Sequence, residues 1–130
     1  MVRGPRLDFP GALYHITDRG NNRAVIFSDL QQYQQFEDRL AECVVRHDWK
    51  LHAYALIPNH FHLLVEQTRT SLSAGMQWLL SGYAAWRNRV TEQVGHVFQG
   101  RFWARLCQRE TYFLEVVRYK GFSTHVPQVA

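Results

Sequence analysis

The sequence predicts an α+β fold: a ferredoxin-like split βαβ sandwich, with a four-stranded antiparallel sheet and an additional C-terminal helix. The first observation is the order of hydrophobic patterns, which runs strand, helix, strand, strand, helix, strand and is typical of this fold. The second is a further helical pattern after the fourth strand. The third is the length of 130 residues, which suits one domain. We therefore expect a single domain over 1–130, with an irregular lead at 1–12 and an atypical tail at 121–130.

The first strand and first helix follow from local pattern. Residues 13–19 (LYHITDR) alternate between two faces, as a half-buried strand does. The GNN segment at 20–22 predicts a turn. Asp29 is placed to cap a helix that runs to about His47, because apolar residues then recur at spacings of three and four.

The remaining elements follow from the same signals. Residues 51–57 and 60–66 predict two adjacent strands joined by a tight connection at Pro58 and Asn59. Ser71 is placed to cap a helix over 72–91. Residues 101–109 predict a fourth strand and 111–120 a third helix, which Gly121 is well placed to end.

Composition indicates a folded protein with a modest basic excess. Lys and Arg number 15 against 11 Asp and Glu, and 46% of residues are hydrophobic. The two cysteines, Cys43 and Cys107, are too far apart for a metal-ligand motif, and we expect both as reduced thiols. The sequence shows no signal-peptide pattern and no stretch of ~20 apolar residues, so we expect a cytoplasmic protein that does not contact membranes.

The sequence PNHFHLLVE at 58–66 holds the most informative pair of residues. His60 and His62 are two positions apart, so on a strand they share a face, while Phe61 and Leu63 point to the other. Imidazole nitrogens bind divalent metals well, and two ligands leave coordination positions open for a substrate. The spacing alone leaves open the alternative of two ordinary histidines bonded to backbone or water.

The predicted fourth strand suggests a nucleic-acid surface. Alternation places on one face the basic side chains of Arg101, Arg105 and Arg109, together with Trp103. Arginines suit phosphates and an aromatic ring suits the faces of bases in a single strand. The alternative is a solvated edge strand with one half-buried tryptophan.

Tyr112 and Tyr119 lie on roughly one side of the predicted last helix. Core packing is the common role of aromatic residues at helical spacing. The alternative is that one phenol is a nucleophile, since a nearby cation and a base can activate a phenol against a phosphate.

Together these stretches resemble a known family. The run ALIPNHFHLLVE resembles the HUH motif of the tyrosine-dependent, single-strand DNA transposases of small bacterial insertion sequences, especially their REP-associated branch. The following stretches support the resemblance: YHITDRGNNRAVIF at 14–27, LSAGMQWLLSGYAAWRNR at 72–89, GHVFQGRF at 95–102 and ETYFLEVVRY at 110–119.

The resemblance implies a function and a set of site residues. It implies that His60 and His62 hold a divalent metal, Mg or Mn, and that Tyr119 on the C-terminal helix attacks a DNA phosphodiester to form a 5′-phosphotyrosine. The implied partner is single-stranded or hairpin DNA, and some relatives are homodimers. Arg19 and Arg23, within the first matching stretch, join the predicted nucleic-acid-binding residues.

Beyond Tyr119 the sequence departs from the family pattern. The family usually carries an Asn or Gln four residues later as a third metal ligand, and Ser123 stands there instead. Ser123, His125, Gln128 or water are the candidate substitutes. The alternative function is therefore a catalytically degenerate nucleic-acid-binding relative of the same fold. A structural zinc site fits poorly, because it normally needs four protein ligands and no cysteine is near the histidines.

Overall fold

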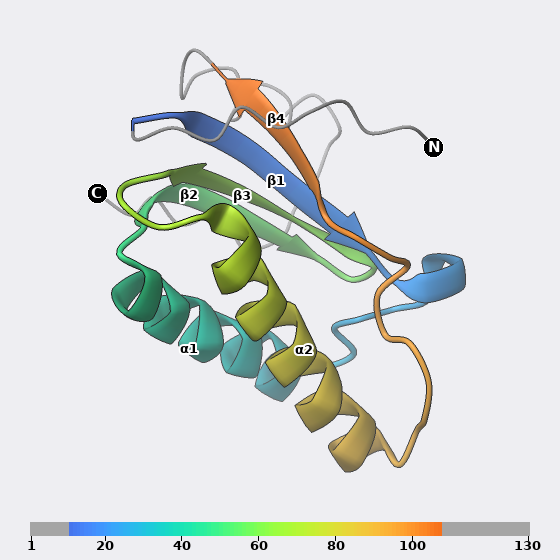
Figure 1. Cartoon of the computed structure of the whole chain (residues 1–130). Helices are drawn as coiled ribbons and strands as arrows, with labels where there is room; N and C mark the ends of the chain where they lie inside the picture. Colours follow the sequence, from blue (N-terminus) through green and yellow to red (C-terminus); the bar gives the residue numbers. More distant parts are fainter. Residues whose placement is uncertain (1–10, 108–130) are drawn as a thin grey trace.

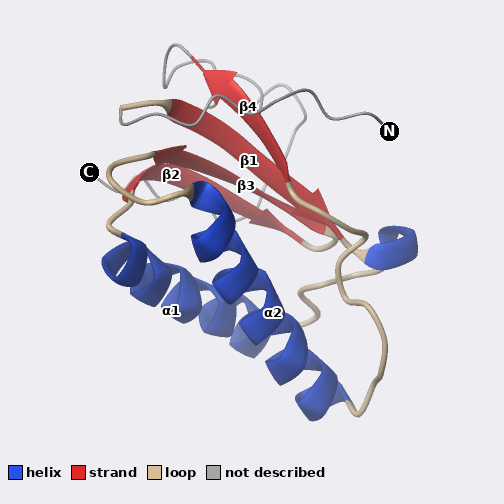
Figure 2. Cartoon of the chain, viewed as in Figure 1, coloured by secondary structure: helices blue, strands red, loops and turns tan. Residues whose placement is uncertain are grey.

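The computed structural model describes residues 11–107, which form two layers. Four strands make one antiparallel sheet in the order β2-β3-β1-β4. Both helices cover the same face of this sheet (Figures 1 and 2). The elements are β1 (Leu13–Arg19), the 3-10 turn η1 (Asn21–Arg23), α1 (Leu30–His47), β2 (Lys50–Ile57), β3 (His60–Glu66), α2 (Leu72–Thr91) and β4 (Trp103–Cys107).

This architecture confirms the predicted α+β, ferredoxin-like sandwich. One prediction was wrong in detail, because the fourth strand begins at Trp103 and not at residue 101. The residues just before β4 contact the end of β1 instead. Phe98 forms an isolated bridge with Gly20, and the Gln99 amide donates to the Arg19 carbonyl at 2.9 Å. Residues 108–109 and the predicted helix at 111–120 lie outside the described residues.

Local capping explains where both helices begin. The Asp29 side chain accepts a hydrogen bond from the Gln32 amide at 2.9 Å, and the Ser71 hydroxyl accepts one from the Ser73 amide at 3.2 Å. Both helices end at residues in the left-handed conformation, Asp48 and Glu92, which stop further helical hydrogen bonding.

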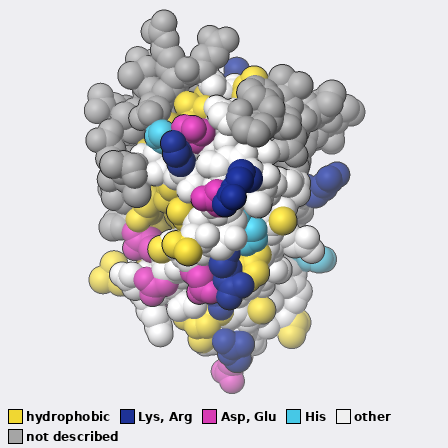
Figure 3. Space-filling view, turned by 60° about the vertical axis from the view of Figure 1, so that its left-hand side comes forward, with side chains coloured by type: hydrophobic (Ala, Val, Ile, Leu, Met, Phe, Trp, Pro, Cys, Tyr) yellow, Lys and Arg dark blue, Asp and Glu magenta, His cyan; other side chains and the backbone are white. Residues whose placement is uncertain are grey.

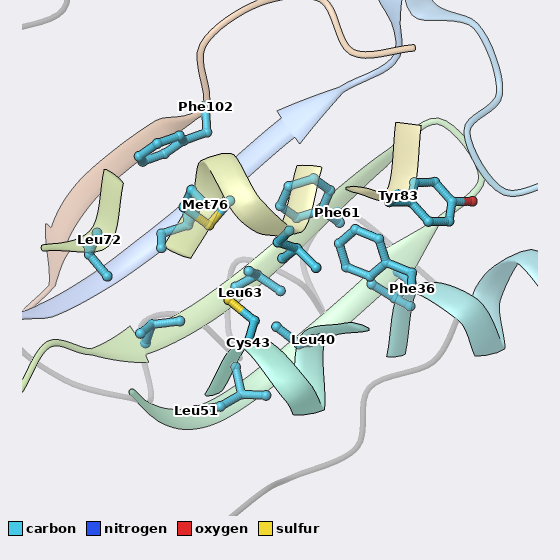
Figure 4. Close-up of a cluster of buried hydrophobic side chains, with 14 of the residues drawn as sticks. Phe36, Leu40, Cys43, Leu51, Phe61, Leu63, Leu72, Met76, Tyr83 and Phe102 are labelled. Carbon is cyan, nitrogen blue, oxygen red and sulfur yellow. The ribbon is translucent and has the colours of Figure 1, made fainter. Parts of the chain in front are cut away.

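The main core lies between the helices and the sheet (Figure 4). Aromatic rings from three elements meet there. The ring centroid of Phe36 on α1 is 5.2 Å from that of Phe61 on β3 and 5.2 Å from that of Tyr83 on α2. The Tyr83 hydroxyl also donates to the Ile26 carbonyl at 2.6 Å. Because this core takes Phe61, Leu63 and Val65 from β3, the side chains at 60, 62 and 64 project from the opposite face.

Candidate metal and nucleic-acid site

The two histidines of the HFH sequence lie side by side on an inner strand. β3 is paired with both β2 and β1, so its backbone is fixed from either side. The ring centroids of His60 and His62 are 5.0 Å apart and the rings are nearly perpendicular, at 81°. His62 is 4% exposed, whereas His60 is only partly buried. The prediction that both histidines share one face of the strand, opposite Phe61 and Leu63, is confirmed, and this face points away from the helices.

Each histidine uses its Nδ1 atom in a hydrogen bond within the protein. His60 Nδ1 is 2.8 Å from the Asn59 side-chain oxygen, and His62 Nδ1 is 2.8 Å from His15 Nε2. These contacts fix the orientation of both rings and involve Nδ1 in each case, so Nε2 is the ring nitrogen that a ligand would use. Metal-binding histidines are typically held in this way, by a second group bonded to the other ring nitrogen.

The spacing of the two rings suits two ligands of one divalent cation. With metal–nitrogen bonds of about 2.1 Å, two ligating nitrogens on one ion are at most about 4.2 Å apart. Rings with centroids 5.0 Å apart can meet this limit. Within residues 11–107, no group of three His, Cys, Asp or Glu residues is arranged to hold a metal. The predicted third ligands, Ser123 and His125, lie outside the described residues, as does Tyr119.

The two residues that lie opposite His62 on the neighbouring strands have small side chains. In the strand register, Ala55 lies opposite His62 on β2 and Thr17 lies opposite it on β1. The Thr17 hydroxyl donates to the Phe61 carbonyl at 2.7 Å, which ties the two strands together beside the histidine. A second apolar cluster shares this face of the sheet and contains Ala53, Ala55, Ile57, Leu64 and Cys107.

β4 adds a tryptophan and an arginine to the face of the sheet that carries His60 and His62, which we call the histidine face. Trp103 pairs with Thr17 and Arg105 pairs with His15, so both side chains point to the same side as His62. Both are exposed, Trp103 by 38%. The predicted alternation is therefore confirmed over 103–107. Arg101 is exposed but precedes the strand, and Arg109 lies outside the described residues.

The other two predicted basic residues lie near the His60 end of β3. Arg19 is opposite His60 on β1, and its Nε donates to the Gln99 side-chain oxygen at 2.6 Å. Arg23 is exposed in the turn η1, with a φ of 60°. The Gly20 amide donates to the Asn59 carbonyl at 2.9 Å, so this turn is anchored beside the start of β3.

Sequence reasoning missed Gln99, which contacts Arg19 of the predicted site. From the sequence, His15 and His52 both lie on strands near the pair and are candidates to support it, although an ordinary hydrogen-bonded histidine is the more common role. The pairing of β1 with β3 shows that His15 is the one that contacts His62. His52, which has similar strand spacing, instead contacts Glu66 at 3.1 Å, at the opposite end of β3 from His60.

The cysteines are poorly suited to metal binding. Burial raises the pKa of the Cys43 thiol to about 12, and its Sγ donates to the Gly75 carbonyl at 3.4 Å in the helical layer. Burial also raises the pKa of the Cys107 thiol, which shares the histidine face but pairs with Leu13 at the far end of β1. Both thiols therefore stay protonated near neutral pH. Because the thiolate is the form that binds metals, neither cysteine suits a metal site.

The side of the molecule formed by α1 and β2 has a different character. Figure 3 shows Lys and Arg side chains beside Asp and Glu on this side. The ion pairs include Arg46–Glu42 at 2.8 Å and Arg69–Asp48 at 3.1 Å. A cavity of about 530 Å³ between α1 and β2 is lined mainly by apolar groups such as Leu40 and Val44. Balanced charge makes this side a weaker candidate for phosphate binding than the histidine face.

Comparison with known protein families identifies the class of protein to which this fold belongs. The chain belongs to the IS200-like transposase family, whose profile matches residues 9–119. This confirms the family that the sequence predicted. No protein with curated annotation matches the chain.

Neither helix of the part of the chain that the structure describes, residues 11–107, has the length and apolar character of a membrane span.

Two solved structures share the fold. One is a REP-associated tyrosine transposase bound to a REP hairpin, with a TM-score of 0.71 and 16% identity over 92% of this chain and 70% of that chain. The other is a Deinococcus radiodurans R1 protein assigned as a candidate transposase. It has a TM-score of 0.63 and 16% identity, over 92% of this chain and 94% of that chain.

Proposed function

We propose that this transposase cuts and rejoins single-stranded DNA through a 5′-phosphotyrosine at Tyr119, with Mg or Mn held by His60 and His62. The observation that carries the proposal is the pair of adjacent imidazoles, each fixed through Nδ1, on a sheet face that also presents Trp103 and Arg105. Family membership supplies the reaction class, DNA transposition.

The histidines serve to position a phosphate for attack. Both rings are fixed by hydrogen bonds, so their Nε2 atoms need little reorganisation to act as ligands. When bound there, a divalent cation supplies charge stabilisation for a non-bridging oxygen of the phosphate. Ala55 and Thr17, which lie opposite His62 on the two neighbouring strands, both carry small side chains.

Tyr119 supplies the nucleophile in this proposal. Its phenolic oxygen forms a bond to phosphorus as the bond from phosphorus to the 3′ oxygen breaks. The phenol proton passes to solvent or a base, and the departing 3′ oxygen takes up a proton to give a 3′-hydroxyl. Attack of a 3′-hydroxyl on the phosphotyrosine reverses the step, so strands are rejoined without ATP.

Trp103, Arg105 and Arg19 provide the DNA contacts. Trp103 can stack on a base, and the two guanidinium groups can contact phosphates along the β1–β4 side of the histidine pair. The structural neighbour bound to a REP hairpin supports a substrate that combines a hairpin with a single-stranded flank.

Tyr119→Phe tests the nucleophile. The substrate is a 5′- and 3′-labelled oligonucleotide with a hairpin and a single-stranded flank, incubated with MnCl₂. We expect wild-type protein to form a covalent adduct that survives denaturing electrophoresis, and the variant to form none while still binding DNA. Adduct formation by Tyr119→Phe at the wild-type rate would contradict the assignment.

Two further reactions separate the roles of the residues. Tyr112→Phe is the matched control, because it removes a phenol from the same predicted helix and should leave the adduct yield unchanged. EDTA or His62→Ala should abolish the adduct and leave binding of the oligonucleotide intact. If the adduct forms equally well in EDTA, the metal part of the proposal is wrong.

A catalytically degenerate DNA-binding protein is the second candidate. One observation favours it: Ser123 stands where the family carries a third ligand, and within residues 11–107 no further His, Cys, Asp or Glu joins the histidine pair in a metal-binding group. This candidate predicts salt-dependent DNA binding that is the same with Mn and with EDTA, and no adduct under any condition.

A further inference from the structure

We propose that His15 is a positioning residue that fixes the proton of His62 and so makes His62 competent to bind a metal. The inference rests on the proposed function, because it assigns the group that prepares one of the two ligands. Its basis is the His15 Nε2 to His62 Nδ1 distance of 2.8 Å, with ring centroids 5.0 Å apart and an interplanar angle of 32°.

The direction of this hydrogen bond decides whether His62 can bind a cation. A neutral imidazole has one N–H donor and one acceptor nitrogen. If His62 donates from Nδ1 to His15, its Nε2 keeps a lone pair for a metal. If His15 donates instead, the only proton of neutral His62 sits on Nε2 and blocks the ligand position. For His62 to bind a metal through Nε2, His15 must therefore act as the acceptor through Nε2, with its own proton on Nδ1.

The Nδ1 atoms of His60 and His62 contact different kinds of hydrogen-bond partner. Asn59 precedes His60 in the sequence, and its side-chain oxygen can only accept, so His60 Nδ1 must donate. His62 depends on a residue 47 positions away whose own tautomer is variable. The state of His62 is therefore coupled to correct pairing of β1 with β3.

The sheet holds His15 firmly in this role. β1 is an inner strand, paired with β3 on one side and β4 on the other, and His15 lies between Leu64 and Arg105 in the register. The Thr17 hydroxyl bond to the Phe61 carbonyl fixes the two strands beside this contact, because Thr17 is the register partner of His62. Because both backbones are fixed, the contact between the rings requires little ordering when a ligand arrives.

Variants of His15 separate hydrogen bonding from simple packing. His15→Gln keeps an acceptor oxygen at about the reach of an imidazole Nε2, whereas His15→Ala removes it. His52→Ala is the matched control, since His52 is also a partly buried strand histidine but contacts Glu66 at the other end of β3. Thermal melts and amide spectra confirm that each variant is folded before it is compared.

The first measurement is the tautomer of His62 in the metal-free, full-length protein labelled with ¹⁵N-histidine. We expect long-range ¹H–¹⁵N correlations to show the His62 proton on Nδ1 in wild type, His15→Gln and His52→Ala. We expect a mixture or the Nε2–H form in His15→Ala. A His62 proton on Nε2 in wild type, or an unchanged tautomer in folded His15→Ala, overturns the inference.

The second measurement is Mn²⁺ affinity, followed by the free-Mn²⁺ electron paramagnetic resonance signal. Loss of a partner behind a metal-binding histidine typically weakens metal affinity by about 10- to 100-fold. We expect this loss in His15→Ala, an affinity near wild type in His15→Gln and no change in His52→Ala. Equal losses in the Ala and Gln variants overturn the hydrogen-bond role. Absence of Mn²⁺ binding in wild type instead overturns the proposed metal site itself.

Discussion

Replacing Arg105 with alanine should reduce the salt dependence of single-stranded DNA binding. Arg105 is exposed on the histidine face, opposite His15. Each phosphate contact made to a single strand contributes about 0.7 to the slope of log affinity against log salt. Between about 50 and about 200 mM NaCl, the variant should therefore lose about 2.6-fold less affinity than wild type.

Trp103→Ala should lower the affinity for DNA without changing its salt dependence. Stacking of one base on an aromatic ring contributes about 1–3 kcal/mol, or roughly 5- to 150-fold in affinity. Because stacking releases no counterions, affinity should fall by a similar factor at every salt concentration, with an unchanged slope. Trp103→Phe keeps an aromatic ring and should recover most of the loss.

Fluorescence anisotropy with a labelled oligonucleotide in EDTA measures both effects, because chelation prevents strand cleavage during the titration. Arg69→Ala is the matched control, as the Arg69 side chain is 85% exposed and forms an ion pair with Asp48. The control should match wild type in affinity and slope. An unchanged slope in Arg105→Ala, or a reduced slope in Arg69→Ala, would refute the placement of DNA on the histidine face.

Three substitutions test the packing of the helical layer. Gly75→Ala should destabilise the protein by about 1–3 kcal/mol in urea unfolding, because a Cβ there would collide with the buried Trp49 ring. Gly82→Ala should stabilise it by up to about 1 kcal/mol through helix propensity, since the Arg39 side chain it meets can move aside; equal effects would contradict the packing argument. Burial raises the pKa of the Cys43 thiol from 9.0 to about 12. The stability that the protein gains from burying the neutral thiol is therefore complete below pH 9, and it is lost as the pH rises toward 12, because the unfolded chain loses its thiol proton first. Stability of Cys43→Ala should fall less steeply over this interval in chemical denaturation, and parallel curves would disprove the assignment.

The helices and most of the strands could be predicted because their causes are local. Asp29 and Ser71 cap helices at the positions that their sequence context suggests. The alternation at 60–66 is enough to place His60 and His62 on one face, because side chains two apart on a strand always share a face.

The contacts around the histidines could not be predicted, because they depend on strand register. Nothing within LYHITDR indicates that Thr17 lies opposite His62, and this pairing is what brings His15 within 2.8 Å of the ring. The start of β4 has a similar cause. The segment at Phe98 and Gln99 is held against the end of β1, so the strand begins only at Trp103.

The central claim is that His60 and His62 together bind one divalent cation. Electron spin-echo envelope modulation of Mn²⁺ added to the full-length protein tests it directly, because coordinated imidazole nitrogens modulate the echo. The account predicts coupling from two histidine nitrogens in wild type and from one in His60→Ala. Bound Mn²⁺ without nitrogen coupling in wild type would contradict it.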